Sequence, residues 1–442
     1  MTLLCCQSYF HVKYELMDQL TVKDIPQKDL ENKRVLVRVD FNVPTEKKDN
    51  KIVITNDLRI RASLPTIQYL TAAKAKVVLV SHLGRPKGFD SDLKMDPIGE
   101  RLSQLLGKKV LKLNDSIGPE VQTAVNNLKA GGVCLLENIR FYKEEEKNDP
   151  DFGRNLAKSF EIYVNDAFGT SHRAHASTAG VCAFLSPCLA GLLLQKEVDS
   201  LTKVLANPVR PFTTILGGSK ISSKIKVIKQ LILKVDTLLI GGAMAFTFVK
   251  AKGGKIGDSL YEENCIPLIK ELDTLKEEYA VALVLPEDMV CVKTENRDQR
   301  SEIRKNSHLS SLTSDLKIFP IDKIPDGYVG LDIGPKTIEK FVKMISQSKT
   351  LFWNGPMGMF EDSQFAVGTK AIAEALVEAT KKKSTTVVGG GDSVTALEDL
   401  KISFDLFTHV STGGGASIEF IEGKVLPGIA CLDKKLSVKS NT

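Results

Sequence analysis

The chain has 442 residues, of which 43% are hydrophobic, 26% are charged and 6% are aromatic, and its net charge is +6. This is the composition of an ordinary globular protein, and the length exceeds what one hydrophobic core supports, so two domains are expected. The mild positive charge comes without a basic block interleaved with aromatic residues, which argues against nucleic acid as a partner.

The eight cysteines include no C-x-x-C pair and lack the spacing of a disulfide framework or zinc site, which indicates a reducing compartment. The N-terminal residues resemble neither a signal peptide nor a transit peptide. The longest uncharged run, 176–195, contains Pro187 and several hydroxyl residues, so it is not predicted to span a membrane. We therefore expect a cytoplasmic protein without membrane or nucleic-acid partners.

Residues 1–17 have no clear period and form a predicted N-terminal extension. Adjacent Cys5 and Cys6 are candidates for acylation there, although a tail without function is the simpler interpretation. From residue 33 onward, β-branched apolar runs alternate with amphipathic stretches long enough for crossover helices, which is typical of a parallel α/β sheet. In the first half the runs lie at 35–39, 77–80, 133–136 and 162–164.

Basic residues gather where these runs end. A single arginine is most often a surface charge, but three at equivalent strand ends are harder to dismiss. Ligands of open α/β sheets bind beyond the carboxyl ends of the strands, and guanidinium groups bind phosphate and carboxylate through paired hydrogen bonds. The first half is therefore predicted to hold a small polyanion. The residues concerned are Arg59, His82, Arg85, Arg140 and Arg173.

An amphipathic helix over 196–205, followed by a Pro-containing break at 207–211, separates the two halves. We predict two Rossmann-like, doubly wound parallel-sheet α/β domains joined by this helical hinge. The predicted limits are 18–195 for the first domain, 196–210 for the hinge, 211–425 for the second domain and 426–442 for a C-terminal segment.

In the second half the runs are followed by glycines instead of arginines. They lie at 213–216, 237–240, 351–353, 386–388 and 409–412. A backbone without side chains at several strand ends permits the close approach of a base, a ribose and phosphates. The run at 386–388 is followed by Gly389, Gly390, Gly391 and Asp392, and a helical pattern begins at Thr395.

Three charged side chains accompany these glycines. Lys220 and Lys224 are spaced one helical turn apart and are expected to face the same side, toward phosphate. Asp392 is expected to hold a divalent cation on phosphate oxygens, while N–H groups at the helix N-terminus face the anion. No Rossmann G-x-G-x-x-G, P-loop or protein-kinase motif occurs. The hypothesis is phosphoryl transfer between the ligands of two domains that close to exclude water.

Six motifs in order resemble those of phosphoglycerate kinases, over residues 20–430. Together they are far more specific than any one of them. They are Arg38-Val39-Asp40-Phe41-Asn42-Val43-Pro44, Ser81-His82-Leu83-Gly84-Arg85-Pro86, Phe168-Gly169-Thr170-Ser171-His172-Arg173-Ala174-His175, Trp353-Asn354-Gly355-Pro356, Gly389-Gly390-Gly391-Asp392 and Ser411-Thr412-Gly413-Gly414-Gly415-Ala416-Ser417.

The resemblance implies reversible transfer of a phosphoryl group between 1,3-bisphosphoglycerate and ADP, giving 3-phosphoglycerate and ATP, in glycolysis and gluconeogenesis. It also implies a monomer. The implied phosphoglycerate ligands are Asp40, Asn42, Arg59, Ser81, His82, Arg85, Arg140 and Arg173. The implied nucleotide ligands are Gly218, Ser219, Lys220, Lys224, Gly242, Gly330, Asn354, Glu361 (on the ribose), Gly389, Gly390, Gly391, Asp392 (on Mg²⁺) and Ser393.

Arg59 and Lys220 are the candidates for stabilising the transferring group, assisted by backbone amides of Gly391 and Gly414 at helix N-termini. The termini extend beyond the usual family length, and the stretch between Arg140 and Asn165 is shorter than in many members. Two alternatives stay open. They are a catalytically silent nucleotide-binding scaffold and a kinase of the same build that acts on another small acid.

Overall fold

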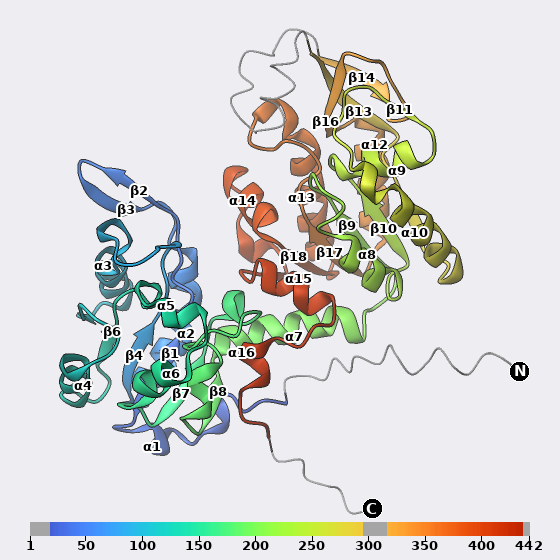
Figure 1. Cartoon of the computed structure of the whole chain (residues 1–442). Coiled ribbons are helices and arrows are strands. Elements are labelled where there is room, and N and C mark those ends of the chain that lie inside the picture. Colours follow the sequence, from blue (N-terminus) through green and yellow to red (C-terminus); the bar gives the residue numbers. More distant parts are fainter. Residues whose placement is uncertain (1–17, 295–315, 436–442) are drawn as a thin grey trace, which may run out of the picture. The chain divides into compact units, whose positions relative to one another are not determined.

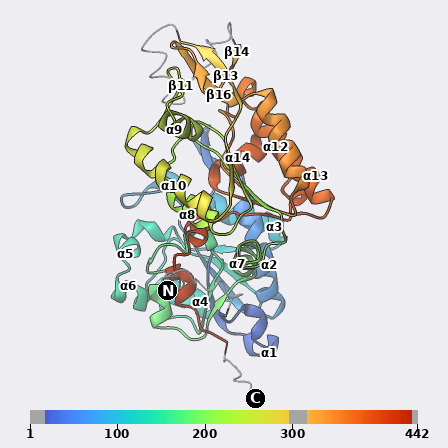
Figure 2. The ribbon, with the colours of Figure 1, turned by 90° about the vertical axis from the view of Figure 1, so that its right-hand side faces the viewer.

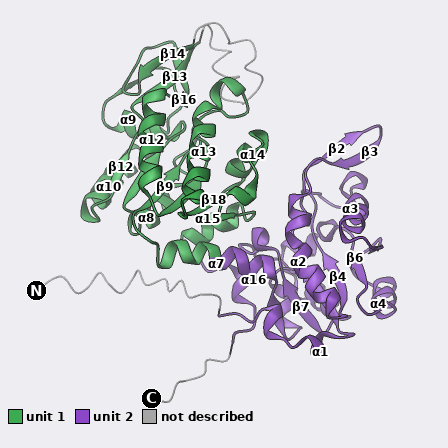
Figure 3. Cartoon of the chain, turned by 180° about the vertical axis from the view of Figure 1, so that it is seen from behind, with its two compact units in different colours: residues 1–14, 200–423 green, residues 15–199, 424–442 purple. Residues whose placement is uncertain are grey.

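The computed structural model describes residues 18–294 and 316–435. The predicted N-terminal extension, with Cys5 and Cys6, and the end of the C-terminal segment lie outside these ranges. The described residues divide into two compact units (Figure 3): unit 2 comprises 18–199 and 424–435, and unit 1 comprises 200–294 and 316–423. The boundary near residue 200 lies inside helix α7 (Leu192–Ala206).

Unit 2 contains six parallel strands in the order β5-β6-β4-β1-β7-β8 (Figure 1). The chain places β4, β6 and β5 on one side of β1 and β7 and β8 on the other, so the order reverses at β1. The four predicted runs form β1, β4, β6 and β7, and the short edge strands β5 and β8 escaped prediction. The bounds are β1 (Arg34–Arg38), β4 (Lys76–Val80), β5 (Leu111–Lys112), β6 (Val133–Leu135), β7 (Ile162–Asn165) and β8 (Cys188–Ala190).

Helices and one hairpin complete unit 2. Strands β1 and β4 are buried on both faces, which explains their continuous apolar runs. Val37, Leu79 and Ile67 meet in one fully buried cluster between the sheet and α2. The helices are α1 (Gln27–Leu30), α2 (Leu58–Ala72), α3 (Asp96–Leu106), α4 (Pro119–Asn126), α5 (Lys143–Glu146), α6 (Pro150–Ala157) and α16 (Pro427–Ala430), and the hairpin pairs β2 (Thr45–Lys48) with β3 (Lys51–Ile54).

Unit 1 repeats the plan with six parallel strands in the order β12-β10-β9-β17-β18-β19. The order reverses at β9, as it does at β1 in unit 2. Trp353 on β17 is fully buried, and its Nε1 donates to the Gly355 carbonyl at 2.8 Å. The bounds are β9 (Phe212–Leu216), β10 (Thr237–Ile240), β12 (Ala282–Val284), β17 (Thr350–Asn354), β18 (Thr385–Gly389) and β19 (His409–Val410).

Figure 2 shows helices α8, α9 and α10 on one face of this sheet and α12 and α13 on the other. Two small sheets that were not predicted add to the unit. One is antiparallel, with β13 (Asp288–Lys293) between β14 (Leu316–Pro320) and β16 (Tyr328–Ile333), and the other pairs β11 (Lys255–Ile256) with β15 (Lys323–Ile324). The helices are α8 (Ile225–Ile232), α9 (Met244–Ala251), α10 (Ile266–Glu278), α12 (Pro335–Gln347), α13 (Val367–Lys381), α14 (Gly391–Asp399) and α15 (Gly415–Ile421).

Helix α14 corrects one prediction, because it begins at Gly391 and not at Thr395. Gly390 is its N-cap residue with φ +93°, a left-handed conformation that glycine adopts without strain. The turn after β18 is therefore shorter than the sequence pattern indicated. As a result, Asp392 lies in the first helical turn.

A buried carboxyl group anchors the start of α7. Asp166, which follows β7, accepts hydrogen bonds at Oδ1 from the backbone N–H of Leu193 (2.9 Å) and Leu194 (3.3 Å). Burial raises the pKa of Asp166 to about 7, against the hydrogen bonds from Thr66 and the helix, which lower it. The group serves as a cap for N–H groups that have no partner within the helix.

Replacing this cap tests its contribution to stability. Asp166→Ala should lower the free energy of unfolding by about 1–3 kcal/mol, because two buried N–H groups lose their acceptor. Asp166→Asn keeps the acceptor and should lose much less in urea unfolding at pH 6. Because the folded pKa lies above the ordinary value, the stabilisation by Asp166 is complete below about pH 4 and is lost as the pH rises through about 7. Equal losses in both variants would contradict the capping role.

Candidate active site

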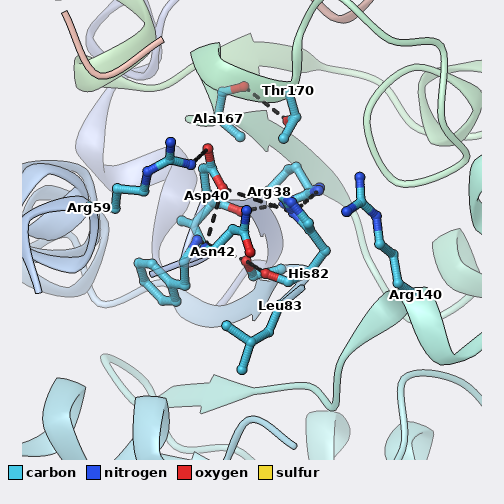
Figure 4. A network of polar contacts seen from close by, with 12 residues as sticks. Arg38, Asp40, Asn42, Arg59, His82, Leu83, Arg140, Ala167 and Thr170 are labelled. Atoms are coloured by element: carbon cyan, nitrogen blue, oxygen red, sulfur yellow. Dashed lines mark hydrogen bonds and ion pairs between the residues drawn. The ribbon is translucent and has the colours of Figure 1, made fainter. Parts of the chain in front are cut away.

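Polar side chains gather at the carboxyl ends of β1, β4 and β6 in unit 2 (Figure 4). Asp40 and Asn42 follow β1, His82 follows β4, and Arg140 lies in the short helix η3 (Ile139–Phe141) after β6. Arg59 comes from the first turn of α2. We call this group, together with Arg38 at the end of β1, the arginine basin. The reversal of strand order at β1 brings its members together, since ligand sites of open α/β sheets lie at such a point.

An ion pair joins two members of the basin. Arg59 Nη1 lies 2.5 Å from Asp40 Oδ2, and the Asp40 side chain is only 10% exposed. Arg59 remains one-third exposed, so its guanidinium keeps donors that an incoming anion can reach. Asp40 therefore orients a cation at the rim without neutralising the whole basin.

His82 is buried among positive charges. Its pKa is lowered well below the ordinary value by burial first and then by Arg38, Arg140 and Arg59. Arg38 donates from Nη2 to His82 Nδ1 at 3.2 Å, and a guanidinium has only donors. The neutral imidazole consequently carries its proton on Nε2, as a hydrogen-bond donor.

Arg38 is a part of the basin that the sequence reasoning missed. It is fully buried, and it donates from Nε to Ser177 Oγ (2.9 Å) and from Nη1 to the Val39 carbonyl. Ser177 in turn donates to Glu145, from Oγ at 2.6 Å and from its backbone N–H at 2.8 Å. The sequence did offer a signal, since Arg38 ends an apolar run that was predicted to be a buried strand. A buried charge needs polar partners, so its position indicated a polar network at this end of the strand.

Asn42 and Ser81 bond to neighbouring backbone. Asn42 Oδ1 accepts from the Gly84 N–H at 2.8 Å, which ties the segment after β1 to the loop after β4. The fully buried Ser81 hydroxyl accepts from the Phe41 N–H at 2.9 Å and donates to the His82 carbonyl at 3.1 Å. Both residues hold the loops of the basin in place, and their contact with substrate stays a prediction.

The two remaining predicted arginines extend from loops. Arg85 and Arg173 are exposed, and Arg173 Nε lies 3.2 Å from His172 Nε2. Burial lowers the pKa of Arg140, and the charges of Arg38 and Arg173 act in the same direction. Arg173 therefore lies within electrostatic reach of the basin. Arg140 itself is nearly buried and donates to the Gly84 carbonyl at 2.8 Å.

The corresponding edge of unit 1 is formed by bare backbone, which we call the glycine platform. A Cβ atom at Gly242 would lie 2.5 Å from the Gly218 carbonyl, and one at Gly390 would lie 2.4 Å from Asn354 Nδ2. Both glycines have positive φ, so no other residue fits these positions without displacement. The platform comprises residues 217–218 after β9, 241–242 after β10, 354–358 after β17 and 389–391 after β18.

A lysine reaches into the platform from the start of α8. Lys224 is the N-cap residue of α8, and its Nζ donates to Asn354 Oδ1, while Asn354 Nδ2 donates to the Gly389 carbonyl at 2.8 Å. Burial lowers the pKa of Lys224 to about 8, partly offset by Asp392. The expectation that Lys220 and Lys224 share one helical face is wrong, because α8 begins at Ile225 and Lys220 lies exposed in the preceding loop.

Beside the platform, unit 1 holds a cavity of about 190 Å³. The apolar wall of the cavity was not predicted from the sequence. Most of it comes from β13 and β16, which were not predicted as strands, and from the segment after β17. Alternating apolar residues in 328–333 were the available signal. The predicted residues that line the cavity are Gly218, Ser219, Gly242, Gly330, Glu361 and Asp392, and the apolar ones are Leu260, Met289, Val329, Leu331, Met359 and Phe360.

The other predicted residues surround the platform. Ser393 Oγ accepts from the Gly355 N–H at 2.6 Å and so joins α14 to the loop after β17. Gly391 is the first residue of α14, and Gly414 is the N-cap residue of α15 with φ +53°. Within the described ranges, no group of three or more His, Cys, Asp or Glu side chains has the arrangement of a metal site. Asp392 is exposed and lines the cavity together with Glu361.

Comparison with known proteins places these features in a family. The family model described as phosphoglycerate kinase matches residues 22–424. The chain belongs to the phosphoglycerate kinase family. It is 54% identical over 419 residues to the phosphoglycerate kinase of Dictyoglomus turgidum, covering 95% of this chain and all of that protein. It is 50% identical to the cytosolic phosphoglycerate kinase of Nicotiana tabacum over 93% of this chain and 98% of that protein.

A solved phosphoglycerate kinase, from Coxiella burnetii, has the same fold, with a TM-score of 0.78 and 36% identity over 93% of this chain and 98% of that one. The predicted family and the predicted pair of parallel-sheet α/β folds are thereby confirmed. In the part of the chain that the structure describes, no helix is long and apolar enough to cross a membrane.

His82 of the arginine basin and His175, on which the charges of Arg38 and Arg140 act, should both stay neutral through the physiological range. His82 has a strongly lowered pKa, and burial followed by Arg38 and Arg140 lowers that of His175 to about 4. In an NMR titration from pH 5 to 8, the ring signals of both should therefore stay flat. His82→Gln and His175→Gln assign the signals among the six histidines of the chain. A midpoint near 6.5 for either signal would contradict this electrostatic description.

Proposed function

We propose that this chain catalyses the reversible transfer of a phosphoryl group from 1,3-bisphosphoglycerate to ADP, giving 3-phosphoglycerate and ATP, as part of glycolysis and gluconeogenesis. The observation that carries the proposal is a set of convergent cations in unit 2 of a phosphoglycerate kinase family chain. The glycine platform and cavity of unit 1 supply a separate site of the kind a nucleotide needs.

The arginine basin binds the phosphoglycerate. Arg59 and Arg140 offer guanidinium donors to phosphate and carboxylate oxygens, and His82 adds an uncharged donor at Nε2. Arg85 and Arg173 reach the ligand from their exposed loops. Asp40 and Asn42 accept from the hydroxyl group or hold the cations in place, and Ser81 supports the loop after β4.

The cavity and platform bind the nucleotide. The apolar wall, beside Gly330, accepts the flat face of the base, and Glu361 accepts hydrogen bonds from the ribose hydroxyls. Lys224 meets the phosphates, together with Lys220, Ser219, Ser393 and Asn354. The backbone of Gly218, Gly242, Gly389, Gly390 and Gly391 lies alongside them, at the N-terminus of α14.

Asp392 fits the binding of Mg²⁺ with the nucleotide. An exposed carboxylate suits an ion that keeps several waters and takes its other ligands from phosphate oxygens. Bound there, Mg²⁺ would neutralise part of the phosphate charge. Asp392 also partly offsets the burial effect on Lys224, so cation and carboxylate are arranged around the same anion.

The transfer step requires positioning and charge neutralisation more than proton transfer. The attacking carboxylate of 3-phosphoglycerate is already ionised at neutral pH, so the reverse reaction needs no general base. Arg59 and Lys220 stabilise the charge on the moving phosphoryl group, with the amides of Gly391 and Gly414. Both ligands must meet in line and water must be excluded, which requires the two units to bring them together about the helical hinge.

The proposal includes a cytoplasmic monomer that acts on small molecules. The described cysteines are all free thiols, which fits a reducing compartment. The alternatives are a silent nucleotide-binding scaffold and a kinase for another small acid. A scaffold would bind nucleotide without turnover, and a panel of phosphorylated and unphosphorylated acids would identify another acceptor.

Lys220→Ala tests the reaction and one catalytic residue together. ATP turnover with Mg²⁺ and 3-phosphoglycerate, coupled to reduction of the 1,3-bisphosphoglycerate formed, should fall by roughly three orders of magnitude, because one cation at the moving group is lost. The control is Lys226→Ala, which removes an exposed lysine of α8. Near-normal turnover of Lys220→Ala would remove Lys220 from the mechanism, and an inactive but folded, nucleotide-binding wild type would refute the reaction.

Arg173→Ala separates the two binding sites. Phosphoglycerate affinity should fall by roughly 10–100-fold, in keeping with the loss of hydrogen bonds to a charged group, and ATP affinity should stay nearly unchanged. Calorimetric titration with each ligand measures both. Arg154→Ala, an exposed arginine over the Phe184 ring, is the charge-matched control. Equal losses for both ligands would contradict the assignment of Arg173 to the phosphoglycerate site.

A further inference from the structure

Two partly exposed thiols meet in unit 2, far apart in sequence. Cys182 lies in the short helix η5 (Gly180–Ala183), and Cys431 directly follows α16 in the C-terminal segment. Cys182 Sγ donates to Cys431 Sγ at 3.1 Å across a separation of 249 residues. We call these residues the thiol pair. The other free cysteines of the described chain, Cys134, Cys188, Cys265 and Cys291, are buried.

The third nearby thiol is less accessible than the pair. Cys188 is 1% exposed, and its Sγ donates to the Leu185 carbonyl at 3.0 Å. Hydrogen bonding with Cys188 and then Cys431 raises the pKa of Cys182, whereas the hydrogen bond from Cys182 lowers the pKa of Cys431. Cys431 is therefore the thiol of the pair that ionises first and attacks an electrophile.

The segment that carries Cys431 is held to unit 2 by hydrogen bonds and packing. Asn165 Nδ2 donates to the Gly428 carbonyl at 2.7 Å, and the Asp433 N–H donates to the Cys188 carbonyl at 2.9 Å. The Leu20 N–H donates to the Asp433 carbonyl at 2.7 Å. A covalent bond at Cys431 would lie between these two anchor points and would secure the segment against detachment.

The thiol pair also borders the support of the arginine basin. Cys431 Sγ donates to the Thr178 carbonyl at 3.6 Å, and the Tyr163 hydroxyl donates to the same carbonyl at 3.1 Å. The preceding residue, Ser177, links Arg38 to Glu145. The segment around Thr178 is therefore held by the thiol pair on one side and by the buried charges on the other.

We propose that Cys182 and Cys431 form a reversible disulfide when the protein meets hydrogen peroxide, and that this bond locks the C-terminal segment onto unit 2. The Cys431 thiolate attacks one peroxide oxygen, the O–O bond breaks, and a sulfenic acid and hydroxide form. Cys182 then gives up its proton, attacks the sulfenic sulfur and expels the second hydroxide. Two thiols lose two electrons and two protons, and the peroxide becomes two waters; a dithiol reductant reverses the change.

Peptide mapping of the full chain after limited peroxide treatment tests the bond. Without reductant, the peptides containing Cys182 and Cys431 should be joined, and two of the eight thiols should be lost and return on reduction. Cys182→Ala and Cys431→Ala should abolish the joined peptide and keep wild-type turnover when reduced. Cys188→Ala, the control at the neighbouring thiol, should leave it. Pairing through Cys188, or sulfinic acid at Cys431 without a joined peptide, would overturn the proposal.

Urea unfolding tests the lock. The oxidised wild-type chain should unfold at a higher urea concentration than the reduced chain, because the bond constrains the unfolded state. Peroxide-treated Cys431→Ala should show no such shift. A joined peptide with an unchanged or lower midpoint would overturn the claim that the bond secures the segment. Neither readout depends on which acid the protein phosphorylates.

Discussion

The burial of the Arg38 charge at the end of β1 constrains much of unit 2. A buried guanidinium is tolerated only when its donors are satisfied and a negative charge lies close. Ser177 accepts one of the Arg38 hydrogen bonds and donates another to Glu145, so it connects the guanidinium to a carboxyl group that is itself fully buried. This requirement draws the segment around residue 177 and helix α5 onto the carboxyl end of β1. Arg38 then fixes the tautomer of His82, so the geometry of the basin follows from one unusual residue.

The two units have the same sheet topology, but different groups occupy the corresponding edge in each. In each, the strand order reverses at the first strand of the sheet, and loops converge on that edge. Unit 2 fills the edge with charged side chains that hold one another in place, as Asp40 holds Arg59 through an ion pair. Unit 1 instead packs backbone on backbone, as Gly242 does on Gly218, and leaves room beside it for a ligand. A small polyanion needs donors from many directions, whereas a nucleotide needs a flat surface and an anion site, so each edge suits one ligand.

The sequence pattern predicted the central strands because they are buried on both faces and read as unbroken apolar runs. It missed β5, β8 and β12, which are two or three residues long, and the antiparallel strands, whose alternation is weaker. The exposed arginines and glycines of the site were visible at strand ends. Arg38 was not recognised as a site residue, because in the sequence it is the last residue of the strand itself and does not follow the strand. Lys220 and Lys224 were wrongly predicted to lie on one helical face, because the prediction assumed that a helix already includes Lys220. A turn follows Gly218, and the helix begins only at Ile225.

Burial also explains why the permanent charges of the basin are arginines. Removing a cation from water lowers its pKa, and the effect is decisive for a group whose ordinary value is near neutrality. His82 and His175 consequently lose their charge, and Lys224 comes close to neutral pH with a pKa of about 8. Burial also lowers the pKa of Arg140, but an arginine starts from so high a value that it stays protonated. A site of the kind proposed, which would hold polyanions while partly shielded from water, is therefore best served by guanidinium groups for charge and by imidazole as a neutral donor.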